Sequence, residues 1–255
     1  MGFFYFYGMD IRHYLDSTYL KTATQAGLTK AGNRDVVKGF IQEAIDENFK
    51  LIMIRPDMVA MAKEMITAAN SKVTIGTVID FPDGNGLLET KLKEATQAIQ
   101  DGADDLDYVV DYEAFKRGET DLVKKQVLEG TRLGLLHGKI VKWIIEVAAL
   151  NDHQIVQLSA LIKNVVLSNF KEDQYANVFV KSSTGFYKTH DGLPNGATVP
   201  TIKLMIENSF PLPVKAAGGV RTYDEALEMI ALGVKRIGTS SAKAIANGEV
   251  SKNEY

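Results

Sequence analysis

The chain has 255 residues, of which 45% are hydrophobic and 24% are charged, and its formal net charge is −3. This is the composition of an ordinary globular protein, and its slight negative charge offers no footprint for nucleic acid or an anionic membrane. The sequence has no cysteine, which excludes disulfides, thiolate metal sites and cysteine nucleophiles.

The four histidines are scattered and show no metal-ligand spacing, so we expect no metal and no other cofactor. No apolar run approaches the ~20 residues of a membrane helix. Residues 1–9 are rich in aromatic side chains and lack the pattern of a signal peptide. We interpret them as an N-terminal extension of a cytoplasmic protein that binds neither membranes nor nucleic acid.

Eight short apolar runs enriched in β-branched residues follow one another along the chain, as expected of strands. They span residues 11–18, 50–56, 72–81, 105–112, 139–147, 177–185, 212–219 and 235–241. Stretches with helical periodicity lie between them. One of these helices is predicted to start at an Asn33 cap, and another to end at Gly102. A later one carries a capping box from Thr222 to Glu225.

The alternation of strand and helix predicts a single-domain (β/α)8 barrel, a fold that typically takes ~250 residues. A doubly wound open sheet is the alternative. No GxGxxG motif follows the first strand, which argues against that alternative. No linker divides the chain, so the barrel is expected to cover residues 10–255, including a short mobile C-terminal tail.

Charged residues interrupt several of the predicted strands. Asp107, Lys181 and Lys215 lie near the carboxyl ends of strands four, six and seven, and Lys142 lies inside strand five. Side chains alternate across a strand, and the outer face of a barrel strand must be apolar to meet the helices. We therefore expect the first three side chains to point into the barrel, at the end where barrel enzymes have their active sites.

A lone strand lysine usually lies at the surface, but three lysines and a carboxylate in one barrel indicate a functional site. An amine attacks a carbonyl only when it is unprotonated, and a nearby ammonium favours that neutral form. Lys181 and Lys215 on neighbouring strands would supply a Schiff-base nucleophile of this kind. Asp107 could then transfer the proton.

The loops after strands seven and eight are the frequent phosphate site of this fold. Gly218 and Gly219 follow strand seven and allow a close backbone approach to an anion. Ser240 and Ser241 follow strand eight and lead into a short helix. The sequence therefore predicts a phosphorylated substrate whose carbonyl reacts with a lysine.

From about residue 11 to the terminal tyrosine, the sequence closely resembles the deoxyribose-phosphate aldolases, class I enzymes that need no metal. The motifs that carry this resemblance are "YLDSTYLK", "TVIDFPDGN", "DGADDLDYVV", "VKWIIEV", "VKSSTGF", "NGATV", "VKAAGGVRTYDEAL" and "RIGTSS". The resemblance implies reversible aldol cleavage of 2-deoxy-D-ribose 5-phosphate to D-glyceraldehyde 3-phosphate and acetaldehyde. The partners would then be phosphosugar and small aldehyde substrates.

The resemblance also assigns roles to individual residues. Lys181 would form the Schiff base, Lys215 would lower its pKa, and Asp107 would relay protons. The substrate-binding residues that it implies are Asp16, Thr18, Lys142, Thr184, Gly218, Gly219, Ser240, Ser241 and Tyr255.

The sequence departs from the family at three places. Met53 stands where some members have cysteine, and Asp80 stands where a neutral residue is common, which would add a carboxylate near the pocket rim. The segment 187–195 is longer than the usual loop and lies beside the Schiff-base strand. These differences bear on substrate range rather than on the catalytic trio.

Two other functions remain open from the sequence. The first is a Schiff-base barrel aldolase with a longer or oxidised donor. The second is a non-catalytic protein that binds phosphosugars or other subunits, which is disfavoured because binding alone does not need a neutral amine. A homodimer is expected, although no interface can be recognised in the sequence.

Overall fold

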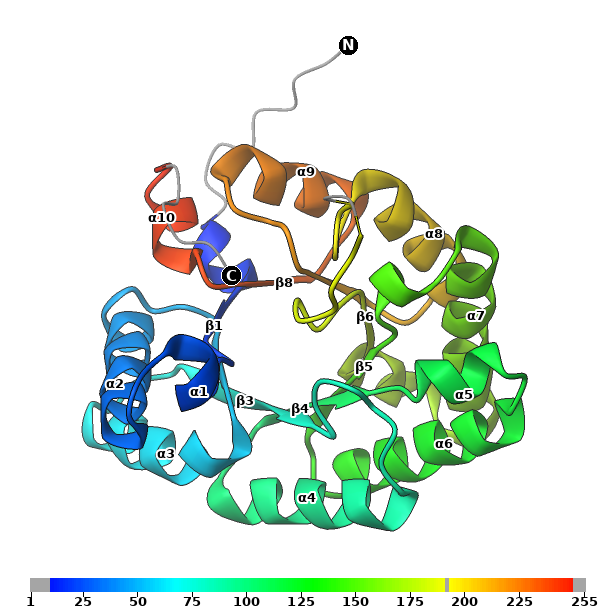
Figure 1. The fold of residues 1–255 in the computed structure, drawn as a ribbon, viewed down its shortest axis with the longest axis horizontal. Coiled ribbons are helices and arrows are strands. Elements are labelled where there is room, and N and C mark those ends of the chain that lie inside the picture. The colour runs from blue at the N-terminus through cyan, green and yellow to red at the C-terminus, as the bar shows by residue number, and fades with distance from the viewer. Residues whose placement is uncertain (1–9, 191–192, 250–255) are drawn as a thin grey trace.

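The strands of this computed structural model, which describes residues 10–190 and 193–249, form a closed parallel barrel. Each strand pairs with the next one in the chain, and β8 returns to β1 (Figure 1). The strands are β1 (Leu15–Thr18), β2 (Leu51–Ile54), β3 (Thr74–Ile79), β4 (Asp105–Val109), β5 (Ile140–Ile144), β6 (Val178–Lys181), β7 (Val214–Ala217) and β8 (Arg236–Thr239). The predicted (β/α)8 barrel is confirmed, and the open sheet is excluded.

Helices form a ring around the strands, with the longer ones lying against the outside of the barrel (Figure 1). The α-helices are α1 (Ala23–Ala26), α2 (Lys30–Asp46), α3 (Val59–Ala68), α4 (Leu88–Asp101), α5 (Tyr112–Lys116), α6 (Thr120–Leu136), α7 (Asp152–Asn169), α8 (Val199–Ser209), α9 (Tyr223–Leu232) and α10 (Ala242–Ala246). Short 3-10 helices occupy η1 (Ile11–Tyr14), η2 (Pro56–Met58), η3 (Val147–Ala149) and η4 (Glu172–Asn177). Among the described residues, none of these helices could cross a bilayer.

The eight predicted strands are all present, but each is shorter than its apolar run. The run at 11–18, for example, begins with the 3-10 helix η1, because Asp10 caps the backbone N–H of Arg12. The caps predicted at Gly102 and Thr222 are confirmed. The predicted start at Asn33 is wrong: α2 begins at Lys30, because the Thr29 hydroxyl accepts the N–H of Gly32.

The two faces of each strand differ as the barrel requires. On β4 and β5, Tyr108 and Trp143 point outward and stack with ring centroids 4.8 Å apart, and both side chains are buried against the helices. Asp107 and Lys142, one position away on the same strands, are buried on the opposite face. The main apolar core therefore lies between strands and helices, and the barrel interior holds the charged side chains beside two smaller apolar clusters.

Helix α6 approaches β5 so closely that only glycine fits at two of its positions. A Cβ atom at Gly130 would lie 2.9 Å from the Trp143 ring, and one at Gly134 would collide with Cγ2 of Val141. By contrast, nothing lies within 4 Å of a Cβ atom placed at Gly39 in the middle of α2.

We predict that Gly134→Ala lowers the free energy of unfolding by about 1–3 kcal/mol, because the overpacking outweighs the gain in helix propensity. The matched variant Gly39→Ala should raise it by roughly 0.5–1 kcal/mol, since only the propensity changes. Denaturant unfolding of both proteins would measure the difference. Equal stabilisation by the two substitutions would contradict the close approach of α6 to the barrel.

Candidate active site

Seven charged side chains meet inside the barrel, and we call them the charge cluster. They are Asp16 on β1, Asp105 and Asp107 on β4, Lys142 on β5, Lys181 on β6, Lys215 on β7 and Arg236 on β8. None is more than 4% exposed. Burying so many charges is unfavourable unless each one is paired, so their contacts decide whether the barrel can hold them.

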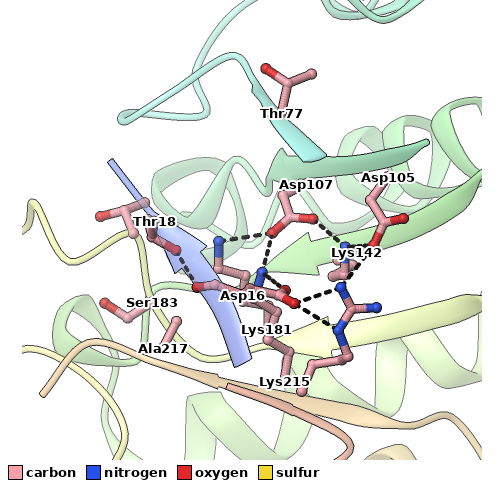
Figure 2. A network of polar contacts seen from close by, with 12 residues as sticks. Asp16, Thr18, Thr77, Asp105, Asp107, Lys142, Lys181, Ser183, Lys215 and Ala217 are labelled. Atoms are coloured by element: carbon pink, nitrogen blue, oxygen red, sulfur yellow. Dashed lines mark hydrogen bonds and ion pairs between the residues drawn. The ribbon is translucent and has the colours of Figure 1, made fainter. Parts of the chain in front are cut away.

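Asp107 lies at the centre of the cluster and accepts hydrogen bonds from three lysines (Figure 2). Its Oδ1 atom accepts from Lys142 Nζ at 2.8 Å. Its Oδ2 atom accepts from both Lys181 Nζ, at 2.9 Å, and Lys215 Nζ, at 3.0 Å. One carboxylate oxygen thus joins the two lysines that the sequence singled out.

The rest of the cluster pairs the remaining charges. Asp16 accepts a hydrogen bond from Arg236 Nε at 2.8 Å, and its other oxygen lies 2.6 Å from Lys215 Nζ. Asp105 accepts from Lys142 Nζ at 2.6 Å and lies 3.5 Å from the Arg236 guanidinium. Every carboxylate therefore contacts at least two cations.

The cluster contains four cationic groups and three carboxylates, so its formal charge is +1 when every group is ionised. Loss of one proton from a lysine makes the set neutral. A cluster shielded from water favours that neutral state, because a net buried charge is poorly solvated.

Lys181 is the lysine that gives up this proton most readily. Burial is the largest cause, and the charges of Lys215 and Lys142 add to it, so that the pKa of Lys181 falls from 10.5 to about 8 despite the attraction of Asp107. An appreciable minority of the Lys181 amine, roughly a fifth at about pH 7.4, is therefore neutral and can act as a nucleophile.

Two neighbours of Lys181, Asp107 and Lys142, stay charged. Burial alone would raise the pKa of Asp107, but the attraction of Lys142, Lys181 and Lys215 outweighs it and holds that pKa well below its ordinary value. Burial alone would lower the pKa of Lys142, yet Asp105 and Asp107 raise it above its ordinary value. Of these three groups, Lys181 is the one whose pKa lies closest to neutral pH.

The structure brings together Asp16, Asp107, Lys142, Lys181 and Lys215, which the sequence analysis named. It adds two members that the sequence analysis missed, Asp105 and Arg236. Asp105 shares the strand face of Asp107, two residues before it, and could have been found by the same alternation. Arg236 is the only charged residue of β8, and the search for interior lysines passed over it.

Thr18 and Met53 are register partners on β1 and β2, nearer to the carboxyl ends of the strands than Asp16. The Thr18 hydroxyl donates to the backbone oxygen of Asp16 at 2.8 Å. Met53 belongs to an apolar cluster with Leu20, Leu51 and Val78, onto which the rings of Phe81 and Phe186 pack. A small apolar surface therefore borders the charged interior on the side of β1–β3.

The predicted phosphate residues lie on two adjacent loops, because β7 and β8 pair directly. Gly218 and Gly219 have φ angles of 80° and 90°, a left-handed conformation that glycine adopts without strain. Ser241 is buried at the start of α10, and Ser240 beside it is half-buried. Gly196 packs so tightly on Gly218 that a Cβ atom would collide with the Gly218 backbone.

Asp80, expected to add a carboxylate near the pocket rim, follows β3 directly and is tied to the loop after that strand. Its carboxylate accepts the N–H of Gly86 at 2.8 Å and lies 3.1 Å from the ammonium of Lys91, a buried residue of α4. Lys91 also donates to the backbone oxygens of Gly84 and Val109. Asp80 thus fixes the loop between β3 and α4 and is fully engaged there.

Two other expectations concern residues at or beyond the edge of the described structure. Tyr255, expected to bind substrate, lies outside the described residues, as do Asp191 and Gly192 of the long 187–195 loop. The start of this loop is anchored by Tyr187, whose ring meets that of Tyr112 edge-on with centroids 6.3 Å apart.

The chain is similar to known aldolases in both sequence and structure. A deoxyribose-phosphate aldolase from Thermococcus gammatolerans is 38% identical over 242 residues, which cover 94% of this chain and 97% of that protein. A solved structure described as "QR15, an Aldolase" has a TM-score of 0.78 and 29% identity, covering 94% of this chain and 95% of that one. No protein-family model matches the chain.

A second solved structure is the deoxyribose phosphate aldolase of Aeropyrum pernix, described as a unique tetramer. It has a TM-score of 0.75 and 26% identity, and the match covers 93% of this chain and 89% of that one. Both the sequence and the barrel therefore resemble aldolases over almost their whole length.

We predict that the Lys181 ammonium titrates near pH 8, since its pKa is lowered to about 8. Lys181 is then charged below this pH and increasingly neutral above it. NMR titration of protein with 13C-labelled lysines would show one resonance with this midpoint, and Lys181→Met would remove that resonance. A midpoint at the ordinary lysine value would contradict the electrostatics of the cluster.

We further predict that two substitutions move this midpoint in opposite directions. Lys215→Met removes a repelling cation and should raise the pKa of Lys181 by on the order of one unit. Asp107→Asn removes an attracting carboxylate and should lower it by a similar amount. Circular dichroism would establish that both variants are folded, and shifts of the same sign would argue against direct charge coupling.

Proposed function

The chain belongs to the deoxyribose-phosphate aldolase family, and we propose that Lys181 forms the imine through which it cleaves 2-deoxy-D-ribose 5-phosphate reversibly to D-glyceraldehyde 3-phosphate and acetaldehyde. The observation that carries this assignment is the position of Lys181 in the charge cluster. It is the cluster lysine whose pKa falls to about 8, and it shares a carboxylate oxygen with Lys215.

The reaction begins with attack of the neutral Lys181 amine on the C1 aldehyde of the open-chain sugar. A carbinolamine forms, and its hydroxyl leaves as water once it has taken up a proton, which gives a protonated imine. This cation withdraws electrons from C2, so the bond between C2 and C3 is weakened. Lys181 thereby supplies the electron sink that the cleavage needs.

Cleavage requires a base for the C3 hydroxyl proton. As that proton leaves, C3 becomes the aldehyde carbon of glyceraldehyde 3-phosphate, and the electrons of the C2–C3 bond form an enamine on Lys181. Protonation of C2 then gives the imine of acetaldehyde, and water releases the product. The cycle consumes one water and returns one, so no external oxidant or reductant is involved.

We assign the proton transfers to Asp107 and Lys215, directly or through water. Asp107 Oδ2 accepts hydrogen bonds from the Lys181 and Lys215 ammonium groups at once, which supports a path between them. Two further members of the charge cluster hold this pair in place: Lys142 contacts Asp107, and Asp16 contacts Lys215. We assign Thr18 to the sugar hydroxyls beside the apolar cluster.

We assign the phosphate of the substrate to the loops after β7 and β8. Gly218 and Gly219 allow close approach of backbone N–H groups, and Ser240 and Ser241 supply hydroxyl donors beside them. Thr184 follows the Schiff-base strand and borders these loops. Tyr255 is retained as a predicted substrate contact from the C-terminal tail.

Assembly and location are further parts of the proposal. The Aeropyrum pernix relative is described as a tetramer, which supports an oligomer here, and the homodimer expected from the sequence stays a prediction. Light scattering in solution would determine the subunit number. The cytoplasmic location likewise stays a prediction from the sequence.

We predict that borohydride reduction in the presence of acetaldehyde attaches a two-carbon group to Lys181, because the imine is reduced to a stable amine. Mass spectrometry of the digested protein would locate it. Lys181→Ala should lose the adduct, whereas Lys203→Ala, which removes an exposed lysine of α8, should retain it. A folded protein with no lysine adduct would overturn the aldolase assignment.

A further inference from the structure

Glu146 is a buried acid next to the site that the reaction described above does not use. Glu146 lies just after β5 and is only 1% exposed. Its φ angle is 55°. A left-handed backbone is unfavourable for a residue other than glycine and is retained mainly where the surroundings hold it in place. The contacts of the Glu146 carboxyl group indicate what it does there.

The carboxyl oxygens of Glu146 contact Ser183 and Thr184, which lie in the loop after β6, shortly after Lys181. The Oε2 atom accepts hydrogen bonds from the N–H of Thr184, at 3.1 Å, and from its hydroxyl group. The Oε1 atom lies 2.9 Å from Ser183 Oγ. One side chain thus fixes the course of the chain just after the Schiff-base lysine.

The hydrogen bonds of Ser183 show which atom holds the proton between it and Glu146. Ser183 Oγ accepts the N–H of Gly185 at 2.9 Å and lies 2.6 Å from the backbone oxygen of Asn195, which can only accept. A hydroxyl group has one hydrogen, and this short contact uses it. The contact with Oε1 is then a hydrogen bond only if Glu146 is protonated and donates.

The surroundings of Glu146 favour this protonated form. Burial is the largest influence and raises the pKa of Glu146 above its ordinary value, although its contacts with Thr184 and Ser183 and the charge of Lys181 oppose it. A neutral acid also leaves the charge balance of the neighbouring cluster unchanged, because it adds no further carboxylate near Lys181. Geometry and electrostatics therefore agree.

The hydrogen-bond chain continues from Ser183 to the phosphate loop. Asn195, which accepts from Ser183, precedes Gly196, and Gly196 packs directly on Gly218. The next residue, Ala197, donates its N–H to the Gly218 oxygen at 2.8 Å. Glu146 is thus connected to the glycine pair through one serine and one backbone segment.

We propose that Glu146 is a positioning residue that acts as a neutral acid, donating to Ser183 and so holding the 195–197 segment against Gly218 and Gly219. Through this chain it sets the shape of the phosphate site while Lys181 carries out the chemistry. The inference rests on the proposed function, because it takes the glycine pair to bind the phosphate of the substrate.

The test compares a phosphorylated with an unphosphorylated substrate. Wild type, Glu146→Ala and Glu146→Gln are assayed with 2-deoxy-D-ribose 5-phosphate and with 2-deoxy-D-ribose. Glu146→Ala should raise KM for the phosphorylated sugar about tenfold or more, because displaced phosphate contacts weaken binding. Its kcat/KM for the unphosphorylated sugar should stay within about twofold of wild type.

Glu146→Gln is the decisive variant. Its amide nitrogen can donate to Ser183 while its oxygen accepts from Thr184, which reproduces the neutral acid. It should therefore keep KM for the phosphorylated sugar within about twofold of wild type. An increase as large as that of Glu146→Ala would overturn the assignment of a protonated, donating Glu146.

Ser183→Ala tests the same link with a smaller change, in case Glu146→Ala does not fold. It should reproduce the selective increase in KM, whereas Ser159→Ala, which removes a buried hydroxyl without a hydrogen-bond partner in α7, should not. Equal losses with both sugars would show a general structural role and would overturn the proposal.

Trapping of the acetaldehyde adduct separates this proposal from the proposed function. If wild type and the variants all trap acetaldehyde on Lys181 but discriminate equally between the two sugars, only the role of Glu146 is overturned. If wild type traps no acetaldehyde, the aldolase assignment itself fails.

Discussion

The Asp107 carboxylate and the three lysines around it impose the constraint on which the rest of the barrel depends. These groups are buried, so each must meet its partners within hydrogen-bond distance or destabilise the fold by several kcal/mol. Strand register supplies this precision, because Asp107 is the register partner of Lys142, and Lys181 is that of Lys215. A slip of one residue would turn a charged side chain into the apolar layer under the helices. The excess cation then gives the cluster its reactivity.

Much of this arrangement could be predicted from the sequence. Alternation of strands and helices predicted the barrel, and alternation within strands placed Asp107 and Lys181 inside it. Arg236 was missed because the search considered lysines, although its strand position was equally informative. Glu146 could not have been predicted, since its role depends on a left-handed backbone and on a loop 37 and 38 residues away in sequence. The Asn33 error has a local cause: Thr29, four residues earlier, offers an equally good cap.

The charge cluster and the residues proposed to bind the phosphate lie on different parts of the fold. The charge cluster lies on strands whose positions are fixed by backbone pairing, whereas Gly218, Ser240 and the described residues of the 187–195 segment lie on loops. Recognition can change with a loop, but the cluster cannot change without disturbing several strands. Glu146 and Lys91 connect these two levels, because each uses a buried side chain to hold a loop against the barrel. Buried side chains thus fix the positions of these two loops.

The ion pair between Asp16 and Arg236 joins residues that are 220 positions apart in the chain. Asp16 emerges early from the ribosome, and its main partner is among the last residues to follow. Lys215, which precedes Arg236, already supplies Asp16 with one cation, and Arg236 adds the second only when β8 pairs with β1 and closes the barrel.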